Sequence, residues 1–245
     1  MNLTPELQMC VDLWKNEDAY NDKFHADLTK AVNRDPVLKA HRDWTEANQY
    51  GFGDRAFGWV WKMLVDQMPS EFSFLEVGVF KGQILSLVAL IAQSSGKIAN
   101  ITGVTTLTNT PDVRCKYPPG DYLGWIHEIY KQFSVPFDHT KLVIGKSADA
   151  HVLEHLAHQT FDCVYIDGSH DYADVVADIR NYAPKVKVGG FLIMDDSSIG
   201  RINVGSCWSG LEDVARAVKD HLDNDPRFKF LFCVGHLNLF YRLKA

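Results

Sequence analysis

The chain has 245 residues, of which 46% are hydrophobic and 23% are charged, as is typical of a globular protein with a substantial core. A formal net charge of −6 and the lack of a polybasic run argue against nucleic acid as a partner. The polar start and the lack of an apolar stretch of about 18 residues predict neither a signal peptide nor a membrane-spanning segment.

Residues 1–70 have a mostly helical pattern that is interrupted at "NQYGFGDRAF" (residues 48–57). We expect them to form an N-terminal helical cap in front of a second domain that spans residues 71–245. Such a cap can serve as a substrate lid over a ligand site. A packing extension, including the dimer surface of a homo-oligomer, would give the same pattern, so both interpretations stay open.

Beyond the cap, short apolar runs alternate with amphipathic helices. Strands are predicted at residues 72–77, 98–104, 140–145, 161–167 and 190–195, and helices between them at about 82–93, 121–133, 147–158 and 172–183. This alternation predicts right-handed crossovers and a parallel sheet. After a further helix near 210–223, "RFKFLFCV" and "NLFYRL" are separated only by Gly235 and His236, which predicts an antiparallel hairpin.

Five parallel strands followed by a terminal hairpin resemble the class I S-adenosylmethionine-dependent methyltransferases. The resemblance implies an α/β fold with a Rossmann-like, doubly wound sheet of seven strands. Most of these strands would be parallel, and the C-terminal hairpin would add the antiparallel pairing.

The stretch "FLEVGVFKGQ" (residues 74–83) turns a strand into a helix and carries Glu76, Gly78 and Gly82. Glycines let the backbone pass close to a ligand, and a helix N-terminus offers unpaired N–H groups, although many such turns hold no ligand. The glycine spacing and Thr105, which stands where dinucleotide sites carry an acid, disfavour a dinucleotide. The motif instead resembles the first motif of O-methyltransferases related to catechol O-methyltransferase. The resemblance implies that the loop holds the methionine end of S-adenosylmethionine, and that Thr105 or a neighbour replaces the usual ribose-binding acid.

Three acids follow two of the predicted strands. Asp167 ends the fourth strand, and Asp195 and Asp196 end the fifth. The carboxyl ends of adjacent parallel strands meet at one edge of the sheet, where unneutralised carboxylates would repel one another. A hard divalent cation such as Mg²⁺ would relieve that repulsion. The alternative is that Asp195 or Asp196 caps a following helix.

His170 lies three residues after Asp167, where a histidine can take a proton from a hydroxyl at neutral pH. A loop histidine held by hydrogen bonds is the alternative. Together, "IDGSH" and the paired acid further along resemble the macrocin O-methyltransferase family over about residues 72–200. The resemblance implies that Asp167 contacts both metal and cofactor, with Asp195 and Asp196 completing the metal site and His170 as the base. It also implies adenine contacts from Ser147 and Ala148 in "GKSAD" (residues 145–149), although Ser147 could cap a helix as well.

These features predict an S-adenosylmethionine-dependent, divalent-metal-assisted O-methyltransferase that acts on a hydroxyl of a sugar, a sugar-bearing natural product or a phenol. The long loop at residues 106–122 and the helical cap are expected to roof the acceptor site. A metal-independent N- or C-methyltransferase and a non-catalytic nucleoside-binding protein are the alternatives. Five scattered cysteines that never form C-x-x-C suit reduced thiols, so we expect a cytoplasmic protein.

Overall fold

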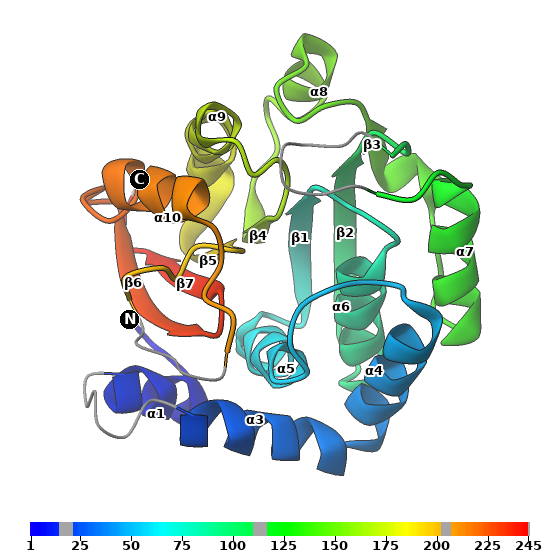
Figure 1. Ribbon diagram of the computed structural model, residues 1–245, viewed down its shortest axis with the longest axis horizontal. Helices are drawn as coiled ribbons and strands as arrows, with labels where there is room; N and C mark the ends of the chain where they lie inside the picture. Colours follow the sequence, from blue (N-terminus) through cyan, green and yellow to red (C-terminus); the bar gives the residue numbers. More distant parts are fainter. Residues whose placement is uncertain (15–21, 110–116, 202–206, 245) are drawn as a thin grey trace.

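The computed structural model describes residues 1–14, 22–109, 117–201 and 207–244 (Figure 1). Within these ranges seven strands form one sheet in the order β3-β2-β1-β4-β5-β7-β6. Strands β1 to β5 pair in parallel, and β7 runs antiparallel to both β5 and β6. The strands are β1 (Glu71–Val77), β2 (Ile98–Thr105), β3 (Leu142–Ile144), β4 (Phe161–Ile166), β5 (Val186–Met194), β6 (Phe228–Val234) and β7 (Leu237–Arg242). The predicted α/β fold with its C-terminal hairpin is confirmed.

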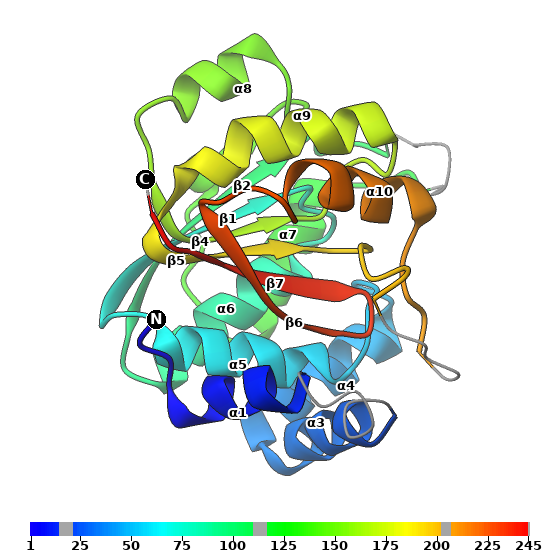
Figure 2. The same cartoon turned by 90° about the vertical axis from the view of Figure 1, so that its left-hand side faces the viewer.

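Helices cover both faces of the sheet, as Figures 1 and 2 show from two directions. Helices α8, α9 and α10 lie on one face, while α5, α6 and the remaining N-terminal helices lie on the other. The helices are α1 (Pro5–Trp14), α3 (Asp22–Arg34), α4 (Pro36–Asn48), α5 (Phe57–Gln67), α6 (Gln83–Ser94), α7 (Tyr122–Gln132), α8 (Ala150–His155), α9 (Tyr172–Tyr182) and α10 (Glu212–His221). Within the described ranges, none of them is long and apolar enough to cross a membrane.

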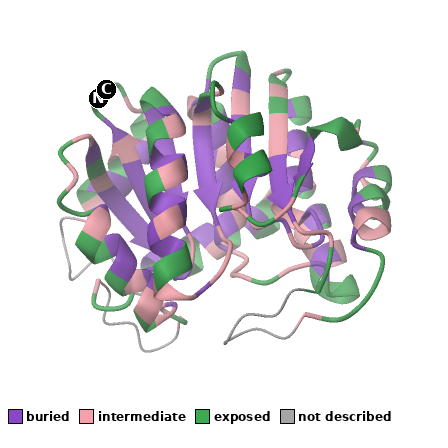
Figure 3. Ribbon diagram, turned by 90° about the horizontal axis from the view of Figure 1, so that it is seen from above, coloured by how far each residue is buried: buried purple, intermediate pink, exposed green. Residues whose placement is uncertain are grey.

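Two hydrophobic clusters sandwich the sheet, one on each face, and the strands are largely buried (Figure 3). In β4, Tyr165 belongs to one cluster, whereas its neighbours Val164 and Ile166 belong to the other. Successive side chains of a strand point to opposite faces, so a strand buried on both sides must be apolar throughout. This explains why the central strands appear in the sequence as continuous apolar runs.

The N-terminal helices share one of these hydrophobic clusters with the sheet. The indole of Trp61 in α5 packs edge-on against Phe74 and Tyr165, with ring centroids 5.7 and 5.1 Å apart. Buried residues of α1, α3 and α4 continue the same cluster. The predicted break is confirmed, because α4 ends at Asn48 and α5 begins at Phe57. The segment therefore packs directly on the sheet, and its service as a lid or dimer surface stays a prediction.

Two elements differ from their predicted bounds by three residues or more at one end or both. Helix α8 is limited to Ala150–His155, shorter than the predicted 147–158, and β5 starts at Val186 instead of residue 190. In β5, Gly189 and Gly190 interrupt the apolar run that marked the strand in the sequence. Pairing of Phe161 with Val186 nevertheless extends the strand, since backbone hydrogen bonds do not require an apolar side chain.

Candidate active site

The ends of β1, β4 and β5 place the predicted acids next to one another. Ile166 pairs with Met194 in the parallel ladder, so the residues that follow them leave the sheet side by side. The amide of Asp195 donates to the carbonyl of Ile166 at 3.0 Å, and the amide of Asp167 donates to the carbonyl of Val77 at 2.8 Å. Backbone hydrogen bonds thus hold both acids at one edge of the sheet.

Asp196 is turned back toward the same edge by an unusual backbone conformation. Its φ of 52° lies in the left-handed region, which aspartate tolerates better than most residues with a side chain. Its carbonyl accepts a hydrogen bond from the amide of Leu211 at 2.8 Å, which fixes the turn. The alternative that Asp195 or Asp196 caps a helix is not observed, because the N-cap residue of α10 is Leu211.

Tyr165 bridges two of the acids, and His170 pairs with the third. The hydroxyl of Tyr165 lies 2.9 Å from Oδ2 of Asp167 and 2.9 Å from Oδ2 of Asp195. The Nε2 atom of His170 lies 2.9 Å from Oδ2 of Asp196, and both side chains are almost completely buried. The structure therefore brings together the proposed base and the three proposed metal ligands.

His236 is a further member of this cluster that sequence reasoning missed. Its Nε2 atom lies 3.5 Å from Oδ1 of Asp195 and 3.7 Å from Oδ1 of Asp196. It occupies the turn between β6 and β7, and the antiparallel pairing of β7 with β5 carries that turn to the edge where the acids lie. The sequence marked Gly235 and His236 only as a turn, and the pairing of β7 with β5 is what shows where that turn lies.

Burial and mutual repulsion disfavour the ionised form of the carboxylates in this cluster. Burial raises the pKa of Asp167 well above its usual value, and the charges of Asp195 and Asp196 raise it further. Burial also raises the pKa of Asp195. Glu76, one residue before the end of β1, has its pKa raised to about 8 by burial, with a smaller contribution from Asp195. A positive charge at this edge would stabilise the ionised carboxylates.

The donor atoms of the cluster form two overlapping groups, each of which could hold a divalent cation. Single donor atoms of Asp167, His170 and Asp196 lie within 4.8 Å of one another, as do those of Asp195, Asp196 and His236. Oδ1 of Asp195 is inaccessible to solvent and has no hydrogen-bond partner among the described residues. An unsatisfied carboxylate oxygen within a group of oxygen and nitrogen donors fits a bound cation.

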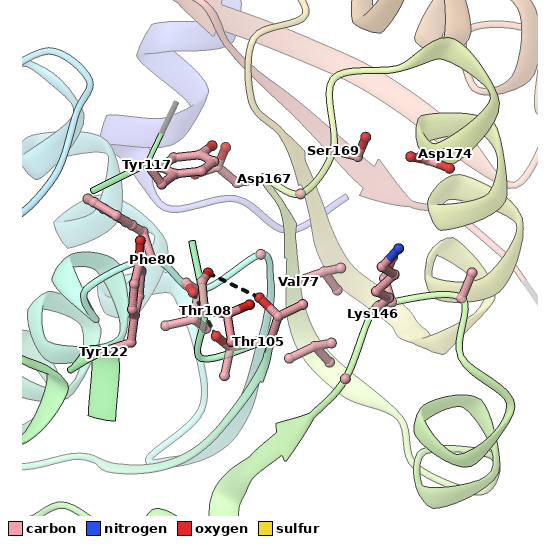
Figure 4. A pocket seen from close by; sticks show the side chains of 18 of the residues that line it. Val77, Phe80, Thr105, Thr108, Tyr117, Tyr122, Lys146, Asp167, Ser169 and Asp174 are labelled. Atoms are coloured by element: carbon pink, nitrogen blue, oxygen red, sulfur yellow. Dashed lines mark hydrogen bonds between the residues drawn. The ribbon is translucent and has the colours of Figure 1, made fainter. Parts of the chain in front are cut away.

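A cavity of about 380 Å³ opens at the carboxyl ends of β1, β2 and β4 (Figure 4). Asp167 lines it, whereas His170, Asp195 and Asp196 do not. Doubly wound sheets bind their ligands at this end of the strands. Of the predicted cofactor-binding residues, five line it: Gly78, Thr105, Ser147, Ala148 and Asp167. Glu76 and Gly82 do not line it.

The two glycines of the loop after β1 meet different requirements. At Gly78, with φ 105°, an added Cβ would lie 1.9 Å from the carbonyl oxygen of Asp167 and 2.6 Å from Cα of Gly168. Gly82, with φ 78°, is the N-cap residue of α6, and a Cβ there would lie 3.2 Å from Ile126. Gly78 therefore allows the chain after β4 to approach the loop, whereas Gly82 starts the helix.

Thr105 lines the cavity, but its hydroxyl is already engaged by the protein. The Oγ1 atom donates to the carbonyl of Val79 at 3.0 Å and accepts from the amide of Leu107 at 3.1 Å. The residue is almost completely buried. Its hydroxyl joins the loop after β1 to the loop after β2, while Thr106 and Thr108 line the same side of the cavity.

The segment after β3 forms the opposite wall of the cavity. The carbonyl of Ser147 accepts a hydrogen bond from the hydroxyl of Tyr182 at 2.6 Å, which ties the segment to α9. The alternative role of Ser147 as a helix cap is not observed, because Asp149 is the N-cap residue of α8. The side chain of Lys146 lies on this wall in Figure 4.

Sequence reasoning also missed an aromatic wall. The ring of Phe80 contacts Tyr117 and Tyr122, with centroids 5.2 and 5.7 Å away, and all three line the cavity (Figure 4). Tyr117 belongs to the long 106–122 loop that was expected to roof the acceptor site. Residues 110–116 of that loop lie outside the described part of the chain.

The fold, together with a cavity at the strand ends that an acidic cluster borders, defines a class I S-adenosylmethionine-dependent methyltransferase. Residues 75–197 match the family model described as "Methyltransferase domain". The chain therefore belongs to this methyltransferase family. No curated protein gives a significant match to the sequence.

Solved structures of methyltransferases share the fold. The S-adenosylhomocysteine-bound Podospora anserina methyltransferase PaMTH1 is 18% identical, with a TM-score of 0.60 over 91% of this chain and 97% of that chain. CalS11, a TDP-rhamnose 3′-O-methyltransferase of calicheamicin biosynthesis, is 18% identical, with a TM-score of 0.53 over 100% of this chain and 97% of that chain. An O-methyltransferase from Bacillus cereus in complex with S-adenosylhomocysteine is 12% identical, with a TM-score of 0.52 over 85% of this chain and 92% of that chain. At these identities the likeness establishes the fold alone.

Proposed function

We propose that the protein transfers the methyl group of S-adenosylmethionine to a hydroxyl of a small molecule with the help of a divalent cation. The observation that carries the proposal is the convergence of Asp167, Asp195 and Asp196 with His170 beside the cavity. The O-methyltransferases among the similar structures support the choice of oxygen as the acceptor atom.

The proposed metal ligands are Asp167, Asp195 and Asp196. When bound there, a cation such as Mg²⁺ would lower the pKa of an acceptor hydroxyl and favour its ionisation. Tyr165 holds Asp167 and Asp195 at a fixed separation through its hydroxyl. This contact prepares two of the three ligands before the cation arrives.

His170 is the proposed base that takes the proton of the acceptor hydroxyl. Its Nε2 atom lies 2.9 Å from Oδ2 of Asp196, so that carboxylate orients the imidazole and stabilises its protonated form. A histidine paired with a buried carboxylate holds the abstracted proton without leaving an isolated positive charge in the cluster.

The methyl donor is proposed to occupy the cavity with its methionine end near Gly78 and Asp167 and its adenine near Ser147 and Ala148. All four residues line the cavity. For the ribose we propose contacts from the wall that contains Thr105, with the neighbouring hydroxyls of Thr106 and Thr108 available on the same side. Glu76 and Gly82 do not line the cavity, and we propose that they support the conformation of the loop between β1 and α6.

Two exposed aromatic rings border the proposed acceptor site. Trp208 is 53% exposed, and its ring centroid lies 4.8 Å from that of His236. Phe52, in the break between α4 and α5, is 71% exposed and stacks on Phe80 at 5.5 Å. Such rings suit the faces of a sugar, a sugar-bearing natural product or a phenol, which are the acceptor classes that we propose.

We also propose that the N-terminal cap contributes to acceptor binding as a lid and that the protein acts in the cytoplasm. The break between α4 and α5 lies against the turn that carries His236, since a Cβ added to Gly53 would be 3.9 Å from the Nε2 atom of His236. Cys10, Cys163 and Cys233 are buried free thiols, which supports a reducing compartment.

The test is transfer of a labelled methyl group from S-adenosylmethionine to a panel of sugars, sugar-bearing natural products and phenols. We expect transfer to a hydroxyl that EDTA abolishes and that the Asp167→Ala and His170→Ala variants lose. Transfer that survives both EDTA and Asp167→Ala would indicate a metal-independent methyltransferase. Failure to bind S-adenosylmethionine in calorimetry would indicate a non-catalytic protein.

A further inference from the structure

His236 belongs to the acidic cluster but comes from a part of the chain beyond the family match. It lies in the turn between β6 and β7, whereas the match ends at residue 197. The amide of Ser197 donates to its carbonyl at 3.0 Å. The rings of Phe57 and Trp208 pack edge-on against the imidazole, with centroids 4.7 and 4.8 Å away. The imidazole is therefore held in one orientation by its own backbone and by two aromatic rings.

The Nε2 atom of His236 faces two carboxylates at distances longer than a hydrogen bond. It lies 3.5 Å from Oδ1 of Asp195 and 3.7 Å from Oδ1 of Asp196, whereas N–H···O hydrogen bonds measure about 2.7–3.2 Å. Oδ1 of Asp195 is inaccessible to solvent and has no hydrogen-bond partner among the described residues. A buried carboxylate oxygen left in this state is unfavourable unless it binds something else.

The 3.5 Å separation from Asp195 lies within the range found between two ligands of one metal ion, and the 3.7 Å separation from Asp196 lies just above it. Nitrogen and oxygen ligands bound about 2.0–2.2 Å from an ion, at tetrahedral or octahedral angles, lie roughly 3.0–3.6 Å apart. The pair formed by His170 and Asp196 differs, because its 2.9 Å separation is that of an ordinary hydrogen bond. The geometry thus separates a histidine that pairs with a carboxylate from a histidine placed as a ligand.

We propose that His236 is a nitrogen ligand of the divalent cation and forms, with Asp195 and Asp196, a mixed nitrogen and oxygen site. Such a site prefers a first-row transition-metal cation such as Mn²⁺ or Co²⁺, which accepts an imidazole ligand more readily than Mg²⁺ does. The inference rests on the proposed function for the presence of a cation, but it does not depend on the methyl acceptor.

A second group of side chains that could bind the cation must be weakened before the binding measurements. Donor atoms of His25, Asp54 and Cys207 also lie within 4.8 Å of one another, close to the turn that contains His236. All measurements are therefore made on protein that carries Cys207→Ser, which removes the thiolate ligand from this group.

The test measures Mn²⁺ binding by electron paramagnetic resonance and calorimetry, with Mg²⁺ as competitor. We expect Mn²⁺ to bind at least about tenfold more tightly than Mg²⁺. The His236→Ala variant should lose about 10- to 100-fold in Mn²⁺ affinity and less than about threefold in Mg²⁺ affinity. Electron spin echo modulation should show ¹⁴N coupling to bound Mn²⁺ that the variant lacks.

Two further variants keep the test decisive. His236→Gln preserves much of the side-chain volume. Its Mn²⁺ affinity should fall as much as that of His236→Ala, and its ¹⁴N coupling should be lost. Thermal unfolding checks that the variant is folded. His155→Ala removes an exposed histidine of α8 and should leave Mn²⁺ binding unchanged.

Mn²⁺ affinity equal to that of the starting protein, with unchanged ¹⁴N coupling, in folded His236→Gln would overturn the inference. So would ¹⁴N coupling that disappears in His170→Ala and persists in both His236 variants, or equal affinity of the starting protein for Mn²⁺ and Mg²⁺. Failure of the proposed function is a separate result. Methyl transfer that continues unchanged in EDTA would contradict metal-assisted catalysis. Loss of Mn²⁺ binding in the His236 variants would still support the assignment of His236 as a ligand.

Discussion

Replacing Gly78 with alanine should destabilise the protein strongly and disturb the acidic cluster. The new Cβ would lie 1.9 Å from the carbonyl oxygen of Asp167, 2.4 Å from its carbonyl carbon and 2.6 Å from Cα of Gly168. All three are backbone atoms, so no side-chain rotation can relieve the clash. The chain after β4 must move, and Asp167 must move with it.

The magnitude follows from two contributions. A residue with a side chain held at φ 105° costs about 1–2 kcal/mol in backbone strain. Forcing an atom into occupied space typically costs about 1–3 kcal/mol more. We therefore expect the free energy of unfolding to fall by about 2–5 kcal/mol, which lowers Tm by roughly 4–20 °C in a chain of this size.

Gly96→Ala is the matched control, assayed by urea unfolding and calorimetry alongside Gly78→Ala. Gly96 also has positive φ, 66°, but an added Cβ there would meet no atom within 4 Å. It should lose only the backbone contribution, about 1 kcal/mol. If Gly78→Ala proves as stable as Gly96→Ala, the close approach of the loop to Asp167 cannot be what requires the glycine.

Three further predictions concern buried charge. Asp167→Asn should raise the stability of the cation-free protein near pH 8, because burial raises the pKa of this carboxyl and its ionisation then opposes folding. Differential scanning fluorimetry should show this higher Tm, and added Mn²⁺ should no longer raise it. Glu76 has its folded-state pKa raised from 4.5 to about 8, so its contribution to stability is complete below about pH 4.5 and is lost as the pH rises through 8. Urea unfolding at pH 5, 6.5 and 8 should therefore show a flatter pH dependence for Glu76→Gln, and an identical profile would contradict the burial of the charge. Lys81→Met should cost about 1–3 kcal/mol, because the ammonium donates to the carbonyl of Gln49 at 2.9 Å and lies 4.4 Å from the ring of Trp125; wild-type urea resistance of this variant would refute that account.

The order of helices and strands could be predicted because local pattern and burial agree along most of the chain. Helix α9 shows this agreement, since Val175, Val176, Ile179 and Tyr182 are buried at spacings of three and four residues. The start of β5 could not be predicted, because Gly189 and Gly190 obscure the apolar run and only pairing with β4 extends the strand.

The acids of the site could be predicted because their positions follow from strand ends alone. Asp167 and Asp195 directly follow paired residues of β4 and β5, so parallel pairing is enough to bring them together. His236 could not be assigned in this way, because its place depends on how the hairpin folds back along β5. The engagement of the Thr105 hydroxyl by two loops likewise depends on tertiary contacts that local pattern does not encode.

The most direct test of divalent-metal-assisted methyl transfer is to remove the cation and restore it. Purified protein is treated with EDTA and desalted, and labelled methyl transfer to an accepting hydroxyl compound is measured before and after Mg²⁺ or Mn²⁺ is added. The role proposed for the acids predicts a fall of at least about 100-fold and full recovery with the cation, with the label on oxygen. Transfer that continues unchanged in EDTA, or a product methylated on nitrogen or carbon, would contradict it.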